Sequence, residues 1–457
     1  MPDSRRLNVS KFIYRIIAVL SILHIPFHMF AQLNTTSPYS RYGVGEFKQP
    51  GFAQNFSMGG IGTAMQSDTI TPYNTNLANP ASLPYMRLTT FEAGLMSNTS
   101  MLSTATQSQT TNATSFGYLS LAFPIKKWWG AALSLSPMTG IGYNVAEAKN
   151  LDSVGSVNYN YHGSGGINKV SFSNGFKIKG LSFGLNASYL FGRMDQSKTV
   201  GMPYGNGYYS TEMDSRINVS DFYFDYGIQY GFTVDSIVKN HKRQALHDPI
   251  RIIVGATYSP MATIGVTSNL VSENYFFSTS GYNTYRDTIE NIQAQKNTIK
   301  LPSMFSVGVS VHKGDKLTIG AEYAMQNWST FEMLGANGGL SNSTRFSVGA
   351  QYTLIHKSDL NVPNTFYMKK VYYRLGFRYN TLPVNIYGTQ INESAVSLGF
   401  GLPVGANRHM WAYNVVNLGL EFGQRGTTSN NLVKEQFFNL VVGITLNDKW
   451  FNKVKFD

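Results

Sequence analysis

The sequence predicts an all-β fold, a transmembrane antiparallel β-barrel of about fourteen strands. Three observations support it: apolar and polar residues alternate in many segments, charged residues make up only 14 % of 457, and the N-terminus is typical of exported proteins. Aromatic residues reach 14 %, yet no internal stretch approaches the ~18 uninterrupted apolar residues of a membrane helix. A barrel that crosses the membrane with strands satisfies all three observations.

The alternation is clearest between Phe222 and Phe232, where Phe222, Phe224 and Ile228 share one face and Gly227 and Gln229 the other. The face with Gly, Ser, Asn or a charge suits a wet or tightly packed interior. A soluble sandwich would carry more Lys and Glu on its open faces. About fifteen segments alternate in this way; they are 88–97, 115–124, 129–138, 167–178, 181–193, 219–232, 250–259, 262–273, 304–312, 316–327, 343–355, 370–381, 393–405, 411–424 and 436–447.

Bacterial barrels close with an even number of strands, so one of these segments is split or spurious. We expect 250–259 and 262–273 to form a single wall position, with Pro260 at a tight turn or a bulge. The expected number is therefore fourteen.

The first residues resemble a signal peptide. Basic residues up to Arg15 precede a mostly apolar stretch from Ile16 to Phe30, and Ala31 offers a small residue for cleavage. Residues 1–31 are therefore expected to be removed on export; the alternative is an N-terminal membrane anchor.

Several classes of site are disfavoured. There is no cysteine, and the eight histidines show no HExxH or paired spacing, so we expect neither a metal nor a cofactor. The basic residues are dispersed, with His241-Lys242-Arg243 the one tight run, so nucleic-acid binding is not expected. Gly180-Leu181-Ser182-Phe183-Gly184 spells G-x-S-x-G but lies in an alternating segment without a following helix, so we expect no enzyme.

Aromatic residues near segment ends suit the interfacial girdles of a membrane barrel. Ordinary packing at strand ends is an equally good explanation. The residues are Trp128-Trp129, Trp328, Trp411 and Trp450-Phe451.

Residues 32–87 precede the first strand and are rich in turn residues. Phe56 to Ala64 reads FSMGGIGTA, Asn79-Pro80-Ala81-Ser82-Leu83 follows, and a strand begins near Thr89. This order closely resembles the N-terminal hatch and first strand of the FadL family of outer-membrane transporters for long-chain fatty acids. Leu301-Pro302-Ser303-Met304 with Trp328-Ser329, and GATYSP at 255–260, resemble other parts of that family.

The resemblance implies three domains: signal peptide 1–31, hatch 32–87 and barrel 88–457. It also implies a bacterial outer membrane with its lipid and lipopolysaccharide, capture of a hydrophobic molecule by extracellular loops, and passage through the hatch or a lateral opening in the wall. Gly59 and Gly60 permit tight backbone turns in the hatch, and Asn79, Pro80 and Ala81 set another. The Asn- and Thr-rich loops and the tail 452–457 depart from the family pattern.

Two loops are expected to form the capture groove. They are 194–218, with Tyr208 and Tyr209, and 270–300, with Phe276 and Phe277 and a short helix at 287–295. The alternative is that these aromatic residues merely decorate exposed loops.

The carboxylate of a fatty acid needs a cationic partner in a low-dielectric lumen. Arg374 and Arg378, on the inward face of one strand, are the best candidates, with Arg193 and Arg345 behind them. The alternative is that these arginines pair with the inward acids Asp225, Glu322 and Glu421.

The function expected from the sequence is uptake of long-chain fatty acids or other hydrophobic small molecules. The alternative is a FadL-like accessory barrel of a secretion or envelope complex, with a protein partner. A hatch argues against a general porin, because porins leave an open channel.

Overall fold

The structure is a computed structural model that describes residues 35–49, 51–66, 74–203, 207–234, 249–277, 283–314, 316–354, 366–404 and 414–448. The predicted signal peptide, His241-Lys242-Arg243, Trp411, Trp450-Phe451 and the tail lie outside these residues. No helix within the described ranges is long and apolar enough to cross a membrane.

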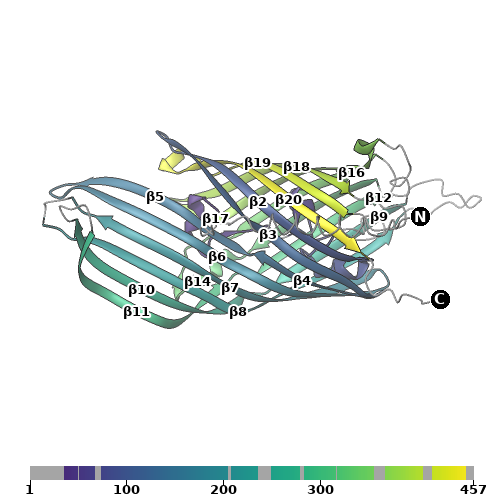
Figure 1. The fold of residues 1–457 in the computed structure, drawn as a ribbon, viewed down its shortest axis with the longest axis horizontal. Helices are drawn as coiled ribbons and strands as arrows, with labels where there is room; N and C mark the ends of the chain where they lie inside the picture. The colour runs from purple at the N-terminus through teal and green to yellow at the C-terminus, as the bar shows by residue number, and fades with distance from the viewer. Residues whose placement is uncertain are drawn as a thin grey trace, which may run out of the picture. The chain divides into compact units, whose positions relative to one another are not determined.

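The strands form one closed antiparallel barrel (Figure 1). Closure is made by β2 and β20, which pair from Thr89 with Asp448 to Ser103 with Lys434. The wall strands are β2 (Thr89–Ser103), β3 (Ser108–Lys126), β4 (Trp129–Pro137), β5 (Thr139–Leu151), β6 (Gly155–Ile178), β7 (Leu181–Gly201), β8 (Ser210–Thr233), β9 (Ile250–Ser259), β10 (Ala262–Phe277), β11 (Asn283–Leu301), β12 (Met304–Lys313), β13 (Leu317–Gln326), β16 (Ser343–Tyr352), β17 (Tyr372–Ile386), β18 (Thr389–Val404), β19 (Asn414–Arg425) and β20 (Lys434–Asp448).

These strands occupy fourteen wall positions in the described chain, because three positions are each made by two consecutive strands. β4 and β5 both pair with β6, β9 and β10 both with β8, and β11 and β12 continue one another beside them. The predicted strand number and the predicted merging of 250–259 with 262–273 are confirmed.

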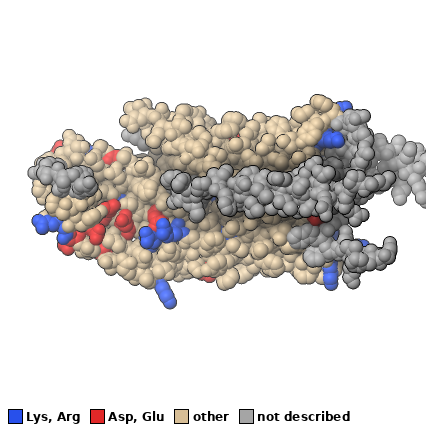
Figure 2. Space-filling view, viewed as in Figure 1, with Lys and Arg blue, Asp and Glu red and all other residues tan. Residues whose placement is uncertain are grey.

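The two faces of the wall follow the alternation of the sequence. On β8 the side chain of Phe222 is 64 % exposed, whereas Gly227 and Gln229 on the opposite face are buried. The exposed face carries aromatic and aliphatic residues, as lipid contact requires. Figure 2 shows few charged residues along the middle of the described surface and more of them toward its ends.

The wall is taller on one side. β5 to β8, β10 and β11 run on past the ends of β18 to β20, to the left in Figure 1. The predicted loops 194–218 and 270–300 are therefore wrong for most of their length, since both lie largely in strands. The predicted helix at 287–295 is also wrong: these residues belong to β11 and pair with β10, consistent with the β-prone Thr288, Ile289 and Ile292.

The N-terminal segment, residues 35–87, lies against inward-facing side chains of the wall. Its elements are the 3₁₀ helix η1 (Pro38–Arg41), strand β1 (Glu46–Phe47), helix α2 (Ala53–Phe56) and the 3₁₀ helix η2 (Pro80–Tyr85). Its backbone amides at Gly62 and Thr63 both donate to Glu322 Oε2 at 2.8 Å.

An apolar core fills the lumen where the tall side begins. Val44 of the N-terminal segment packs with inward residues of the wall such as Ile141, Leu190 and Ile264. Trp328 belongs to this core: it is 2 % exposed and meets the Phe47 ring edge-on at 5.1 Å. Of the two explanations given for Trp328, packing describes it and a girdle role does not.

Candidate functional site

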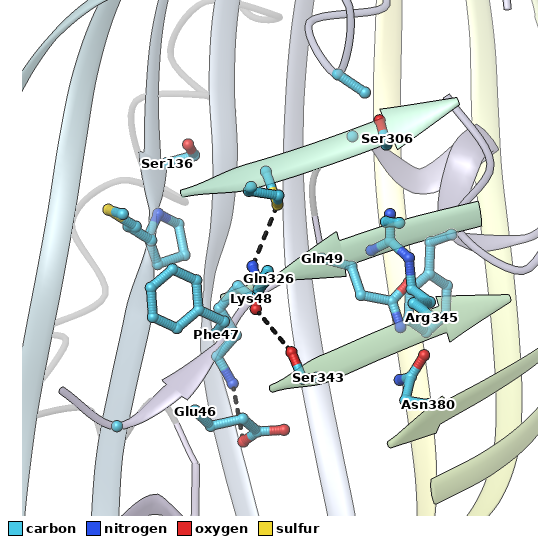
Figure 3. A pocket seen from close by; sticks show the side chains of 18 of the residues that line it. Glu46, Phe47, Lys48, Gln49, Ser136, Ser306, Gln326, Ser343, Arg345 and Asn380 are labelled. Atoms are coloured by element: carbon cyan, nitrogen blue, oxygen red, sulfur yellow. Dashed lines mark hydrogen bonds and ion pairs between the residues drawn. The ribbon is translucent and has the colours of Figure 1, made fainter. Parts of the chain in front are cut away.

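The lumen contains a cavity of about 340 Å³ between the N-terminal segment and the wall. Figure 3 looks into it: Phe47, Lys48 and Gln49 lie between Ser136 on one side and Arg345 on the other. The lining combines apolar residues, such as Met96, Phe116 and Met138, with buried charged groups.

The wall is split beside this cavity. β3 pairs with β4 only from Leu119 to Lys126, and the described ladders give residues 108–118 no neighbour on that edge. The strand that would continue there, β5, diverges from β3 after Met138. Phe116 and Met138 lie on opposite sides of the split and both line the cavity.

The N-terminal segment takes the place of β3 along the lower part of β5. Glu46 and Phe47 of β1 pair with Gly140 and Thr139, and the Lys48 amide donates to the Met138 carbonyl at 2.9 Å. Gly45 is required for this approach, because it has a φ of +97° and an added Cβ would lie 2.5 Å from the Gly140 carbonyl oxygen. β1 therefore covers an edge that the split would otherwise leave open.

A lysine of the wall lines the cavity close to the split. Lys169 of β6 is paired in register with Ser136, two residues before Met138. It has no ion-pair or hydrogen-bond partner in the described part of the chain. Because an ammonium group in a mostly apolar cavity gains most from an anion, Lys169 is placed to bind one.

Arg378 is already neutralised. Its guanidinium donates to both Glu421 oxygens at 2.9 Å, and it also pairs with Glu393. Arg345 similarly donates to Glu322 at 2.6 Å. For these two arginines the second interpretation from the sequence is confirmed: they pair with inward-facing acids of the wall.

Arg374 is buried and donates to the amide oxygens of Gln351 and Asn417 at 2.8 and 2.7 Å. It does not line the cavity, whereas Arg378 does. The prediction that Arg193 faces the lumen is wrong: its side chain is 58 % exposed and pairs with Asp195 on the outer surface. Arg193 has the same parity as Phe183 and Phe191, which are exposed on the outer face of β7.

A charged network ties the N-terminal segment to the wall above the cavity. Arg425 of β19 donates to Glu46 at 2.7 Å and to Glu393 at 2.6 Å. Burial would raise the pKa of Glu46, but the charges of Arg425 and Lys48 hold that pKa well below its usual range. Glu46 is therefore an ionised anchor of the segment.

Below the cavity the wall meets the N-terminal segment through inward-facing glycines. An added Cβ on any of them would lie less than 3.0 Å from an atom of the segment, so only glycine lets the two backbones approach this closely. We call this set the glycine belt; it comprises Gly130, Gly175, Gly184, Gly227, Gly255, Gly320, Gly349, Gly376, Gly399, Gly419 and Gly443. Many are direct register partners, for example Gly349 with Gly320 and Gly376.

The predicted turn residues of the segment lie against this belt. Gly59 and Gly60 have φ values of +70° and +83°, and the Gly59 amide donates to Ser397 Oγ at 2.9 Å. Asn79 accepts a hydrogen bond from the Ala81 amide at 3.0 Å, with Pro80 as the first residue of η2.

The predicted aromatic residues of the groove meet at one corner of the tall side. Tyr208 and Tyr209 are about half exposed between β7 and β8, beside the end of β10 that carries Phe276 and Phe277. Tyr208, Tyr209 and Phe276 do not line the lumen cavity.

Two functional features escaped the sequence analysis. Lys169 lies two and four residues before Ser171 and Ser173, whose side chains face inward. The alternation of the strand therefore predicts that Lys169 also faces inward. The glycine belt is visible in the sequence as an inward-facing glycine on most strands. The sequence does not show, however, which residues of the N-terminal segment pack against each glycine.

The FadL-like fold is confirmed by comparison with solved structures. The CymD monoaromatic hydrocarbon channel aligns with a TM-score of 0.52 and 13 % identity over 89 % of this chain and 100 % of that one. A Pseudomonas aeruginosa FadL homologue aligns with a TM-score of 0.55 and 11 % identity over 89 % of this chain and 100 % of that one. The Pseudomonas putida toluene transporter TodX aligns with a TM-score of 0.55 and 14 % identity over 88 % of this chain and 99 % of that one. At these identities the likeness concerns the fold alone. No curated protein matches the sequence. The family model described as BamG matches residues 12–457, and the chain therefore belongs to the BamG family.

Proposed function

We propose that this protein takes up hydrophobic small molecules across a bacterial outer membrane, with residues 32–87 acting as a hatch and the split between β3 and β5 as the lateral exit. The observation that carries the proposal is the cavity lined from both sides of the split, by Phe116 of β3 and Met138 at the start of β5. The resemblance of the fold to hydrocarbon channels supports it.

The lateral route follows from the difference between two contacts of the N-terminal segment, the contact with the glycine belt and the ladder with β5. The glycine belt leaves no space for a ligand between the segment and the wall below the cavity. An apolar molecule in the cavity gains ~0.8 kcal/mol for each methylene that leaves water, and the split offers it a direct way into lipid. Among the described elements, the short ladder between β1 and β5 lies along that way.

Lys169 favours an anionic amphiphile, with a long-chain fatty acid as the proposed substrate. Its ammonium would hold the carboxylate inside the cavity while the chain lies toward Phe116 and Met138. The capture residues proposed at the tips, Tyr208, Tyr209 and Phe276, would act before this step.

A cross-link of β1 to β5 tests the route. The chain has no cysteine, and Phe47 and Thr139 are register partners at a spacing that suits a disulfide. We expect Phe47→Cys/Thr139→Cys, when oxidised, to lose most uptake of radiolabelled oleate into cells, and reduction to restore it. Ser394→Cys/Gln424→Cys, a register pair within the wall, is the matched control and should transport normally in both states. Full uptake by the oxidised double variant would contradict the lateral route.

The second candidate function is an accessory barrel of an envelope complex. The glycine belt favours it, because a lumen sealed by backbone packing suits a structural subunit as well as a transporter. In this case the wild-type protein would neither bind nor take up oleate or toluene, and an envelope protein would co-purify with it at fixed stoichiometry.

A further inference from the structure

Two adjacent hairpins at the base of the barrel carry a feature that the proposed function does not use. The base is the end at which β2 begins and β20 ends, and the hairpins join β3 to β4 and β6 to β7. Their ends are fastened together, because the Lys177 amide donates to the Trp128 carbonyl at 2.8 Å.

Four aromatic rings lie in a stack across these strands. Trp128 and Trp129 are 6.1 Å apart at 24°, Trp129 and Phe176 6.0 Å at 18°, and Phe176 and Phe183 5.6 Å at 31°. Trp128 and Phe183 are nearly half exposed, and Phe172, four residues before Phe176 on β6, is exposed as well. The stack is therefore on the lipid side of the wall, at its lower edge.

Three exposed lysines stand at the end of the stack. They are Lys126, Lys127 and Lys179, and the Lys126 ammonium lies 5.4 Å from the centre of the Trp128 ring. None of them forms an ion pair within the residues that the structure describes. The sequence also contains no Asp or Glu in residues 120–146 or 153–194, so neither hairpin neutralises them.

We propose that this platform is a binding site for an anionic phospholipid of the surrounding membrane. The phosphate would lie among Lys126, Lys127 and Lys179, and the glycerol and the start of the acyl chains along the aromatic stack. An acidic protein would satisfy the lysines but not the stack, which faces hydrocarbon. A ligand with an anionic head and acyl chains on one molecule fits both parts.

The base supplies a comparison. The hairpin between β12 and β13 carries Lys313 and Lys316 without an aromatic stack beside them in the described ranges. The two hairpins therefore share a pair of lysines and differ in the platform, and the sequence of the second also has Asp315 between its lysines.

The test is lipid retention by the purified full-length barrel, measured by native mass spectrometry with phosphatidylglycerol and phosphatidylcholine. We expect Lys126→Gln/Lys127→Gln to weaken phosphatidylglycerol binding about tenfold. Lys313→Gln/Lys316→Gln should change it less than twofold. Trp128→Leu should weaken it while leaving the lysines in place, and inorganic phosphate should fail to displace the lipid.

Equal retention of the two lipids by the wild type would overturn the proposal. So would equal effects of the two lysine pairs, since attraction would then be a matter of net charge alone. Displacement by inorganic phosphate would reduce the site to an anion site without lipid specificity and would overturn it as well. Unaltered heat-dependent mobility of the variants on gels shows that the barrel itself is intact.

Discussion

The N-terminal segment meets the wall in two different ways at two levels of the barrel. Below the cavity it approaches through the glycine belt, for example with Gly376 against Gly59 and Gly349 against Met58. Along β5 it joins the wall as a strand, where β1 replaces β3 as the neighbour. The first contact excludes side chains and water over a broad surface, whereas the second is two residues long. The difference indicates which contact can open without unfolding the barrel.

A side chain on the belt should break the first contact. In Gly376→Val the new Cβ would overlap the Gly59 nitrogen, which is backbone and cannot turn aside. We expect a loss of ~3 kcal/mol or more, seen as failure to form a heat-resistant folded band on gels. The control is Gly201→Ala on β7, where the nearest atom to an added Cβ lies at 3.6 Å. Normal folding of Gly376→Val would mean that the belt is not tightly packed.

The two contacts also differ in how far the sequence predicts them. The strands from Phe222 to Phe232 and from Tyr372 to Asn380 followed from alternation, because lipid and lumen impose opposite polarity on the two faces. Alternation does not state what fills the lumen, so neither the partner of Gly376 nor the apolar core around Trp328 could be derived. The tall strands were mistaken for loops because residues 283–296, apart from half-buried Ile292, are exposed on both faces and show no period of two.

Two of the cations that line the cavity sharpen the comparison, because Arg378 is held in buried ion pairs and Lys169 lies close to the split. Arg378→Met would leave Glu421 buried without its ion-pair partner and Glu393 with Arg425 alone, at a cost of about 3–5 kcal/mol in stability. Lys169→Met should leave thermal stability nearly unchanged but weaken oleate binding by about tenfold. Binding of toluene, which has no charge, should be unaffected by Lys169→Met. Equal loss of oleate and toluene binding would show that Lys169 shapes the cavity rather than binding an anion.

The smallest expected effect concerns the ion pair that supports β1. Because Arg425 and Lys48 hold the pKa of Glu46 below its ordinary value, the folded state favours the ionised carboxylate. Its contribution is therefore complete above the ordinary carboxyl pKa of about 4.3 and is lost as the pH falls through the lower value of the folded state.

Glu46→Gln should accordingly lower the free energy of unfolding at pH 7 by about 1 kcal/mol, and the thermal midpoint should fall with it. The difference from wild type should shrink below about pH 4. Calorimetry across this range measures it, with Glu147→Gln on the exposed part of β5 as the control. A difference that stays constant down to pH 3 would mean that Glu46 supports β1 by packing alone. A difference that fades would show that the charge of Glu46, which pairs with Arg425 and Lys48, keeps the short ladder closed on the side of the barrel where opening is expected.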